Sequence, residues 1–306
     1  MYGNPDGDWV GDIAGHLGLN GNFSEDAQFC DAEDHIFTLA VNSPCAADNN
    51  DCGELIGARP VDCESVDTET TLHVPAEYAT LALAIDASVD GDTILIECGN
   101  YQVDNLQVFS KEIVIRSESS TPECVTLFAG NSGRILTGHG VAGGFRMEGL
   151  TLQSADFAAL YFYAGAPRIR NCVFQNNNQS IVDYESFTRI NNCTFWNNHG
   201  PCVSAYSAGF PSVHGSIFWG NHGDLFFESW GGISVSCSDV EGGWPGTGNF
   251  DLNPLFCNPN GNLFRLHPES PCSPDNNDCG ILIGACSVGC AVSTRSLNWG
   301  DLKSLY

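Results

Sequence analysis

Tyrosines and carboxylates recur on short, otherwise apolar segments in the middle of the chain. They are Tyr161, Tyr163, Asp183, Glu185, Tyr206 and Glu228, with Ser204 among them. Aromatic rings stack on the apolar face of a pyranose, and carboxylates accept hydrogen bonds from sugar hydroxyls. Two carboxylates at a suitable separation can also hydrolyse a glycosidic bond. The residue types predict a carbohydrate site, and the structural alternative is that tyrosine simply favours strands.

A second candidate group is cationic. Arg146, Arg168 and Arg189 follow one another at intervals of 22 and 21 residues. If they occupy one strand position in successive repeats, three guanidinium groups form a column that could bind a carboxylated sugar. The alternative is pairing with surface carboxylates, since Glu148 and Arg170 fall side by side on the next strand position.

Two acidic runs could hold a hard cation. Asp48-Asn49-Asn50-Asp51 and Asp275-Asn276-Asn277-Asp278 carry side-chain oxygens, which are the ligands that Ca²⁺ prefers. The runs lack the length and glycine placement of an EF-hand loop, and Asx turns are the favoured explanation. Ca²⁺ is therefore the one cofactor left open. No zinc site is predicted, because no short cysteine pair meets a second pair with neighbouring histidines.

The elements that must position these residues are short strands. From Gly149 onwards, similar blocks follow one another at 21 to 23 residues, at 149–152, 171–174, 192–195 and 215–218, with 234–237 after them. Such units are too short to fold alone and have no helix to cross over a sheet, so we expect them to stack. Cys172 then stacks on Cys193 and Phe174 on Phe195 in the interior, with Asn171 and Asn192 at the preceding bends.

The register of these strands decides which side chains reach solvent, because side chains alternate across a strand. The side chains expected inside are Leu160, Phe162, Val182, Tyr184, Val203 and Ala205. The candidate sugar-binding residues then point outward on adjacent coils.

One helix is predicted before the repeats. Leu81, Ala84, Ile85 and Ser88 lie on one face at helical spacing within residues 78–88, and Asp90-Gly91-Asp92 ends the helix. Such a helix can seal the open end of a stack of sheets.

A much longer repeat defines the domains. Residues 12–63 align without a gap with residues 239–290 and are identical at 24 of these 52 positions, so a whole domain has been duplicated. The predicted organisation is a C-terminal remnant of an upstream β-helix copy (1–63), a linker (64–72), a β-helix with its capping helix (73–240), a cysteine-rich cap (241–290) and the start of a linker to a missing module (291–306).

The 15 cysteines indicate an oxidising compartment. The suggested pairs, whose connectivity spacing alone leaves open, are Cys45–Cys52, Cys98–Cys124, Cys237–Cys257, Cys272–Cys279 and Cys286–Cys290. Cys172, Cys193 and Cys202 are expected to be buried thiols. Cys30 is expected to be unpaired, because Val10 stands at the position that matches Cys237.

The segments His73-Val74-Pro75, Gly91-Asp92-Thr93-Ile94-Leu95-Ile96 and Gly99-Asn100-Tyr101 resemble the entry segment of right-handed parallel β-helix proteins of the pectin-lyase-like superfamily. The Asn-Cys-x-Phe units resemble the repeat of secreted bacterial β-helix proteins. Over residues 73–290, the resemblance implies an all-β fold, a single-stranded right-handed parallel β-helix with an N-terminal capping helix and disulfide-stapled C-terminal loops. It leaves activity open, because the superfamily includes lyases, glycosidases, esterases and adhesins.

Catalytic motifs of these enzymes are largely missing from the sequence. Gly138-His139-Gly140 resembles one short segment of β-helix polygalacturonases, but their paired-Asp and Arg-Ile-Lys segments do not occur here. No residue is therefore assigned a catalytic role. The predicted function is non-catalytic carbohydrate binding or adhesion; a polysaccharide lyase or glycoside hydrolase is the alternative, and a structural spacer is the second alternative.

The charge balance limits the partners. With 37 acidic and 11 basic residues, the formal charge of −26 excludes nucleic acid and disfavours anionic lipid. No apolar run is long enough to span a membrane, and a signal peptide is expected to be missing from this fragment. We expect an extracellular or cell-surface location, with a polysaccharide or cell-surface glycan and tandem β-helix copies as partners.

Overall fold

The computed structural model describes residues 27–31, 36–50, 52–63, 70–130 and 133–290. The chain divides into two compact units, one up to Thr70 and one from Thr71. The predicted linker lies outside the described residues except at Thr70, Thr71 and Leu72, and β4 already begins at Thr71. The predicted terminal linker (291–306) also lies outside them.

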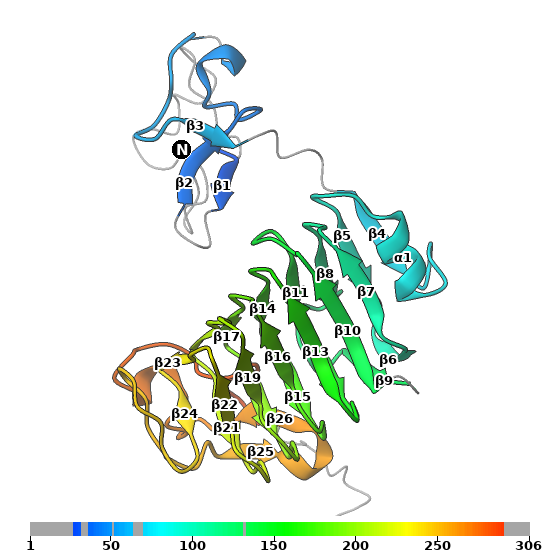
Figure 1. Cartoon of the computed structure of the whole chain (residues 1–306). Helices are drawn as coiled ribbons and strands as arrows, with labels where there is room; N and C mark the ends of the chain where they lie inside the picture. The colour runs from blue at the N-terminus through cyan, green and yellow to red at the C-terminus, as the bar shows by residue number, and fades with distance from the viewer. Residues whose placement is uncertain (1–26, 32–35, 51, 64–69, 131–132, 291–306) are drawn as a thin grey trace, which may run out of the picture. The chain divides into compact units, whose positions relative to one another are not determined.

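The second unit is a parallel β-solenoid in which each coil gives one strand to each of three sheets (Figure 1). The eight-stranded sheet contains β4 (Thr71–Val74), β5 (Thr93–Ile96), β8 (Val114–Ser117), β11 (Arg146–Glu148), β14 (Arg168–Arg170), β17 (Arg189–Asn191), β20 (Ser212–His214) and β23 (Ser234–Ser236). The seven-stranded sheet contains β6 (Gly99–Val103), β9 (Val125–Ala129), β12 (Thr151–Gln153), β15 (Val173–Gln175), β18 (Thr194–Trp196), β21 (Ile217–Trp219) and β24 (Asp239–Val240). The six-stranded sheet contains β7 (Leu106–Phe109), β10 (Arg134–His139), β13 (Ala158–Tyr163), β16 (Ile181–Tyr184), β19 (Val203–Tyr206) and β22 (Phe226–Ser229).

The interior is a set of stacked apolar rows, as predicted. The rings of Phe174 and Phe195 stack with their centroids 4.8 Å apart, and Phe195 and Phe218 stack at 4.5 Å. Cys172, Cys193 and Cys202 are buried free thiols, which confirms their assignment to the interior. In-register stacking thus repeats the same side chain at the same place in successive coils.

The bends between strands are also repeated. Asn171 and Asn192 adopt left-handed backbone, with φ of 49° and 50°, as predicted for these positions. A ladder of side-chain amides lies at a different bend. Asn177 Nδ2 donates to Asn198 Oδ1 (3.2 Å), and Asn198 Nδ2 donates to Asn221 Oδ1 (3.0 Å). These amides bond to one another from coil to coil, which offsets the cost of burying Asn177 and Asn198.

Each end of the interior is covered. Helix α1 (Leu81–Ala87) is capped by Thr80, whose side chain accepts a hydrogen bond from Leu83 N, and it buries Leu81, Ala84 and Ile85. The predicted capping helix is therefore confirmed, although it starts later than expected. At the other end Trp244 packs on Phe226, with ring centroids 4.5 Å apart, which the sequence did not indicate.

Residues 241–290 include a segment that folds back over the outer face of the seven-stranded sheet. It contains the antiparallel pair β25 (Phe256–Asn258) and β26 (Leu263–Leu266) and the 3-10 turns η3 (Pro259–Gly261) and η4 (Pro274–Asn276). Phe256 and Phe264 pack on Trp196 at 5.8 and 6.1 Å. We call residues 254–290 the flap, because they cover this sheet face.

The disulfides differ from most of the predicted pairs. Cys98–Cys124 is confirmed, but the other bonds are Cys30–Cys63, Cys237–Cys279 and Cys257–Cys290. The pairs Cys45–Cys52, Cys237–Cys257, Cys272–Cys279 and Cys286–Cys290 were wrong, as was an unpaired Cys30; Cys45, Cys52, Cys272 and Cys286 are free. The reason is spatial. The fold of the flap buries Cys272 against Asp239 and brings Cys279 to Cys237.

The described part of the first unit has the same local structure as the flap. Strands β1 (Phe29–Asp31) and β2 (Ile36–Ala40) pair as Phe29↔Leu39, and 227 positions later Phe256 pairs with Leu266. The 3-10 turn η2 (Ala47–Asn49) corresponds to η4, and β3 (Val61–Cys63) carries the second cysteine of a disulfide that repeats Cys257–Cys290. The sequence repeat is therefore a structural repeat.

Candidate functional site

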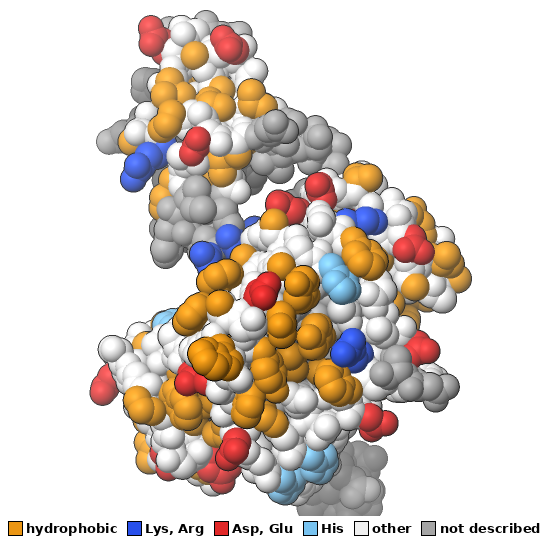
Figure 2. Space-filling view, viewed as in Figure 1, with side chains coloured by type: hydrophobic (Ala, Val, Ile, Leu, Met, Phe, Trp, Pro, Cys, Tyr) orange, Lys and Arg blue, Asp and Glu red, His pale blue; other side chains and the backbone are white. Residues whose placement is uncertain are grey.

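The outer face of the six-stranded sheet carries rows of aromatic side chains. Register pairs Tyr163 with Tyr184, and Tyr184 with Tyr206, in successive coils. Tyr163 and Tyr184 stack at 5.4 Å, and the row continues through His139, which stacks on Phe109 at 4.8 Å. Figure 2 shows hydrophobic side chains gathered over this face.

A groove of about 240 Å³ opens on this face. Its lining residues are Phe157, Tyr161, Gln179, Val182, Tyr184 and Tyr206. These described lining residues include three tyrosines and one carboxamide but no carboxylate, so the groove offers flat apolar rings edged by hydroxyl and amide groups. This combination suits a neutral polyhydroxylated ligand.

Arg134 supports one wall of the groove. Its guanidinium lies 4.6 Å from the ring centroids of both Phe157 and Tyr161, an arrangement that fixes the two rings through cation–π attraction. Burial raises the pKa of Tyr161 above its usual value of 10, although Arg134 opposes the shift. The phenol is therefore neutral at physiological pH and can donate a hydrogen bond.

The predicted outward position of Asp183 is wrong. Leu160 pairs with Ile181 and Phe162 with Asp183, so Asp183 faces inward and Tyr184 faces outward. The carboxylate of Asp183 is fully buried and accepts hydrogen bonds from the backbone N and the Oγ1 of Thr188. Burial raises its pKa to about 6. The expected inward positions of Val182 and Tyr184 are wrong for the same reason, a register shifted by one residue.

The two other candidate carboxylates are exposed but do not line the groove. Glu185 follows β16 in left-handed backbone and accepts a hydrogen bond from Ser207 Oγ at 3.2 Å. Glu228 lies on the last strand, β22, and accepts from Ile233 N at 2.6 Å. Tyr161 and Tyr206 do line the groove, whereas Tyr163 stacks beside it. The structure thus brings Tyr161 and Tyr206 to the groove, and none of the predicted acids is among its lining residues.

The arginine column forms as predicted. It lies on the eight-stranded sheet and not on the six-stranded sheet that carries the groove. Arg146, Arg168 and Arg189 are register neighbours on β11, β14 and β17 of the eight-stranded sheet, and Glu148 pairs with Arg170 beside them. Each of the three arginines has a partner within the protein. Structural pairing is therefore the better supported explanation of the column.

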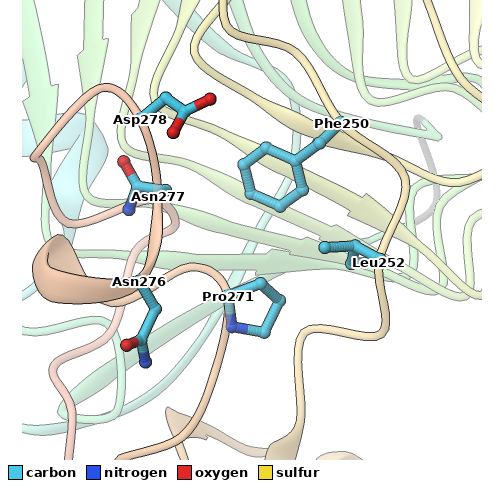
Figure 3. A pocket seen from close by; sticks show the side chains of 6 residues that line it. All are labelled: Phe250, Leu252, Pro271, Asn276, Asn277 and Asp278. Carbon is cyan, nitrogen blue, oxygen red and sulfur yellow. The ribbon is translucent and has the colours of Figure 1, made fainter.

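The second Asp-Asn-Asn-Asp run lines a pocket of about 140 Å³ with Phe250, Leu252 and Pro271 (Figure 3). Asn277 Nδ2 donates to the carbonyls of Ser273 and Ile281 at 2.7 and 2.9 Å, and its Oδ1 accepts from Cys279 N. Asn50 makes the corresponding bonds in the first unit. These contacts are those of Asx turns and support that alternative; Ca²⁺ binding stays a prediction.

One further group has metal-ligand chemistry. Ligand atoms of Cys98, Glu118 and Cys124 lie within 4.8 Å of one another. Both sulfurs belong to the Cys98–Cys124 disulfide, and Glu118 accepts a hydrogen bond from Cys98 N. The group therefore offers no thiolate and is explained by the disulfide.

Comparison with known proteins adds no assignment. No protein-family model matches the chain, and no curated protein matches its sequence. The parallel β-solenoid rests on the structure itself. Among the described helices, none is long and apolar enough to cross a membrane.

Sequence analysis missed four of the six residues that line the groove, namely Phe157, Gln179, Val182 and Tyr184. A signal was present for Tyr184, because Tyr163, Tyr184 and Tyr206 follow one another at intervals of 21 and 22 residues, the spacing of the repeat. Phe157 and Gln179 carry no comparable signal, since they lie outside the strands.

Proposed function

We propose that this chain is an extracellular carbohydrate-binding module, of the adhesion or glycan-capture type, that holds a neutral glycan in the groove of the six-stranded sheet. The observation that carries the proposal is the groove formed by Tyr161, Tyr184 and Tyr206 on three adjacent coils. Rings spaced at one coil can stack on successive faces of one sugar chain, while the hydroxyls and Gln179 bond to its hydroxyl groups.

The size of the groove and the charge of the whole chain define the ligand further. Its volume of about 240 Å³ is below the roughly 300–1,000 Å³ of a typical small-molecule pocket. We expect the groove to hold one or two sugar rings and the rest of the chain to follow the Tyr163 row. The formal charge of −26 disfavours polyanionic glycans unless cations bridge them. Four disulfides support a location outside the reducing cytosol.

Catalysis has less support than binding. General acid and base hydrolysis needs two carboxylates beside the bond that breaks, and the described lining residues of the groove include none. The resemblance to the pectin-lyase-like superfamily supports a role in polysaccharide recognition but assigns no reaction.

A glycan array probed with the purified chain, together with a reducing-sugar assay on the glycans that bind, tests the proposal. We expect binding to neutral glycans without release of reducing ends, and loss of binding in Tyr184→Ala. Phe187→Ala is the matched control, because Phe187 is an exposed aromatic residue that does not line the groove. Release of reducing ends would favour the enzyme alternative. If the chain shows no glycan binding and no turnover, the structural spacer is the alternative that remains.

A further inference from the structure

The first unit presents the same apolar face as the flap. Phe29 and Phe37 meet edge to face with centroids 5.5 Å apart and an interplanar angle of 84°. Phe256 and Phe264 meet at 5.5 Å and 88°. The same pair geometry, strand register and disulfide in two separate units show that this face is built in the same way twice.

In the flap this face is closed against a sheet. Phe264 is 3% exposed and Ile283 is fully buried. Gly284 N donates to Gly215 O at 2.7 Å, and Ala285 N donates to Thr194 Oγ1 at 3.0 Å. A Cβ on Gly284 would lie 2.5 Å from Ile217 Cδ1, so the flap backbone lies directly on the sheet.

In the first unit the equivalent side chains are exposed to solvent. Phe37 is 46% exposed and Ile56 is 38% exposed, at the positions of Phe264 and Ile283. Leu55 beside them is 44% exposed. Among the described residues, nothing lies within 4 Å of a Cβ built on Gly57, the counterpart of Gly284. The unit therefore keeps the shape and chemistry of a flap while its contact face is open.

We propose that this face of the first unit, formed by Phe29, Phe37, Leu55, Ile56 and Gly57, docks on the outer face of the seven-stranded sheet of a second β-solenoid of this kind, one that has no flap of its own. The partner face would carry side chains like Trp196, Ile217 and Thr194, because these are what the flap covers. The chain's own sheet is not the partner, since the flap already occupies that face.

Cys52 gives the proposal a covalent signature. Its counterpart Cys279 forms a disulfide with Cys237, which lies on the solenoid side of the contact. Cys52 itself is free and exposed. When the first unit docks on a second solenoid, the Cys237 of that solenoid reaches Cys52. The two thiols lose two electrons and two protons to a thiol-disulfide oxidant, such as oxidised glutathione, and one S–S bond forms.

The test is a lengthened chain in which a second copy of residues 71–238 is joined directly before Asp12. This junction keeps the register of the repeat, because Asp12 aligns with Asp239. Refolding in a glutathione redox buffer, followed by non-reducing peptide mapping, should find Cys52 bonded to the added Cys237. Maleimide labelling of Cys52, complete in the original chain, should be lost. Ile56→Asp should lower the unfolding temperature of the lengthened chain but leave that of the original chain unchanged.

A control chain carries residues 71–290, with their own flap, before residue 64. The proposal is overturned if this control folds and the lengthened chain does not. It is also overturned if Cys52 stays reactive in a folded lengthened chain, or if Ile56→Asp has the same effect in both chains. A fourth result would also overturn the proposal: the original chain dimerises as its concentration rises, and Ile56→Asp makes it monomeric. The apolar face of the first unit would then bind the same face of another chain and not a solenoid.

Discussion

Asp183 and Thr188 are joined by two hydrogen bonds inside the solenoid, from the backbone N (3.0 Å) and Oγ1 of Thr188 to the carboxylate. Asp183 is flanked on β16 by Val182 and Tyr184, which line the groove on the opposite side of the strand. The pair therefore fixes the bend that follows β16. It places an ionisable group directly beneath the candidate binding surface.

The buried carboxyl of Asp183 predicts a stability that falls as pH rises. Its pKa of about 6 in the folded state lies above its usual value near 4, so the folded state holds a proton that the unfolded state has lost. The stabilisation is complete below about pH 4 and is lost as pH rises through 6. The stability lost by the parent protein over this pH range is at most about 3 kcal/mol. In Asp183→Asn this loss should disappear, because the amide does not titrate. Urea unfolding of both proteins at pH 4.5 and 7.5 measures it; an equal pH dependence in the two would contradict the assignment.

Asp239 predicts a similar effect at the flap contact. Burial, followed by the neighbouring charges of Asp251 and Glu241, raises the pKa of Asp239 to about 7, although its carboxylate accepts hydrogen bonds from Leu252 N and Cys272 Sγ. Stability is again present at low pH and lost as pH rises, here through 7. Asp239→Asn should therefore stabilise the protein at pH 8 relative to the parent, and by a smaller amount at pH 5. Thermal unfolding at the two pH values checks it, with Asp224→Asn as the control, because Asp224 is exposed and is not among the charges that act on Asp239.

The sequence was sufficient to predict the stacked coils, but it did not determine which residues of each strand face the interior. Phe174 and Phe195 recur at the coil period inside an unambiguous alternation, and they stack as expected. In β16 three successive residues from Ile181 to Asp183 are buried, so alternation alone could not tell which face each one occupies. A carboxylate was assumed to face solvent, whereas two hydrogen bonds from Thr188 make its burial tolerable.

Cysteine connectivity was beyond the sequence for a different reason. Cys237 and Cys279 are 42 residues apart, and they meet because the flap returns across the outside of the sheet. Nothing in the local spacing of Cys272 and Cys279 indicates that one faces Asp239 and the other faces Cys237. Long-range packing decided the pairing, and local spacing could not.

Ring stacking in the groove predicts a graded effect of substitutions at Tyr184. Tyr184→Phe keeps the ring and loses one hydroxyl, so glycan affinity should fall only a few-fold. Tyr184→Ala removes the stacking surface and should weaken binding by about tenfold or more, which corresponds to about 1.4 kcal/mol. Titration calorimetry with a glycan selected on the array measures both. Equal losses in the two variants would mean that the hydroxyl, and not the ring, carries recognition.

The Cys237–Cys279 disulfide predicts a specific role for covalent closure of the flap. It closes a loop of 42 residues, so its removal in Cys279→Ser should cost about 4 kcal/mol in the chain-entropy account. The lost stability should appear as more frequent opening of the flap, because the disulfide joins the flap to Cys237, the residue that follows β23, and not to the interior of the solenoid. Hydrogen exchange followed by mass spectrometry should show faster exchange at residues 254–290 and unchanged exchange in β13 and β16. Uniformly faster exchange in all three sheets would show instead that the flap and the solenoid unfold as one unit.

The stacked phenylalanines provide the last prediction, since stacked aromatic pairs occur both in the interior and on the surface. Phe195 lies between Phe174 and Phe218 and is fully buried, whereas Phe187 stacks on Phe210 at 6.2 Å in an exposed position. Phe195→Ala leaves a cavity between two rings and should cost about 3–5 kcal/mol. Phe187→Ala should change stability by less than about 0.5 kcal/mol, because the lost contact is solvated in both states. Urea unfolding monitored by circular dichroism measures both values. A small cost for Phe195→Ala would mean that the hydrogen bonds between strands, and not the stacked rings, provide most of the stability of the coils.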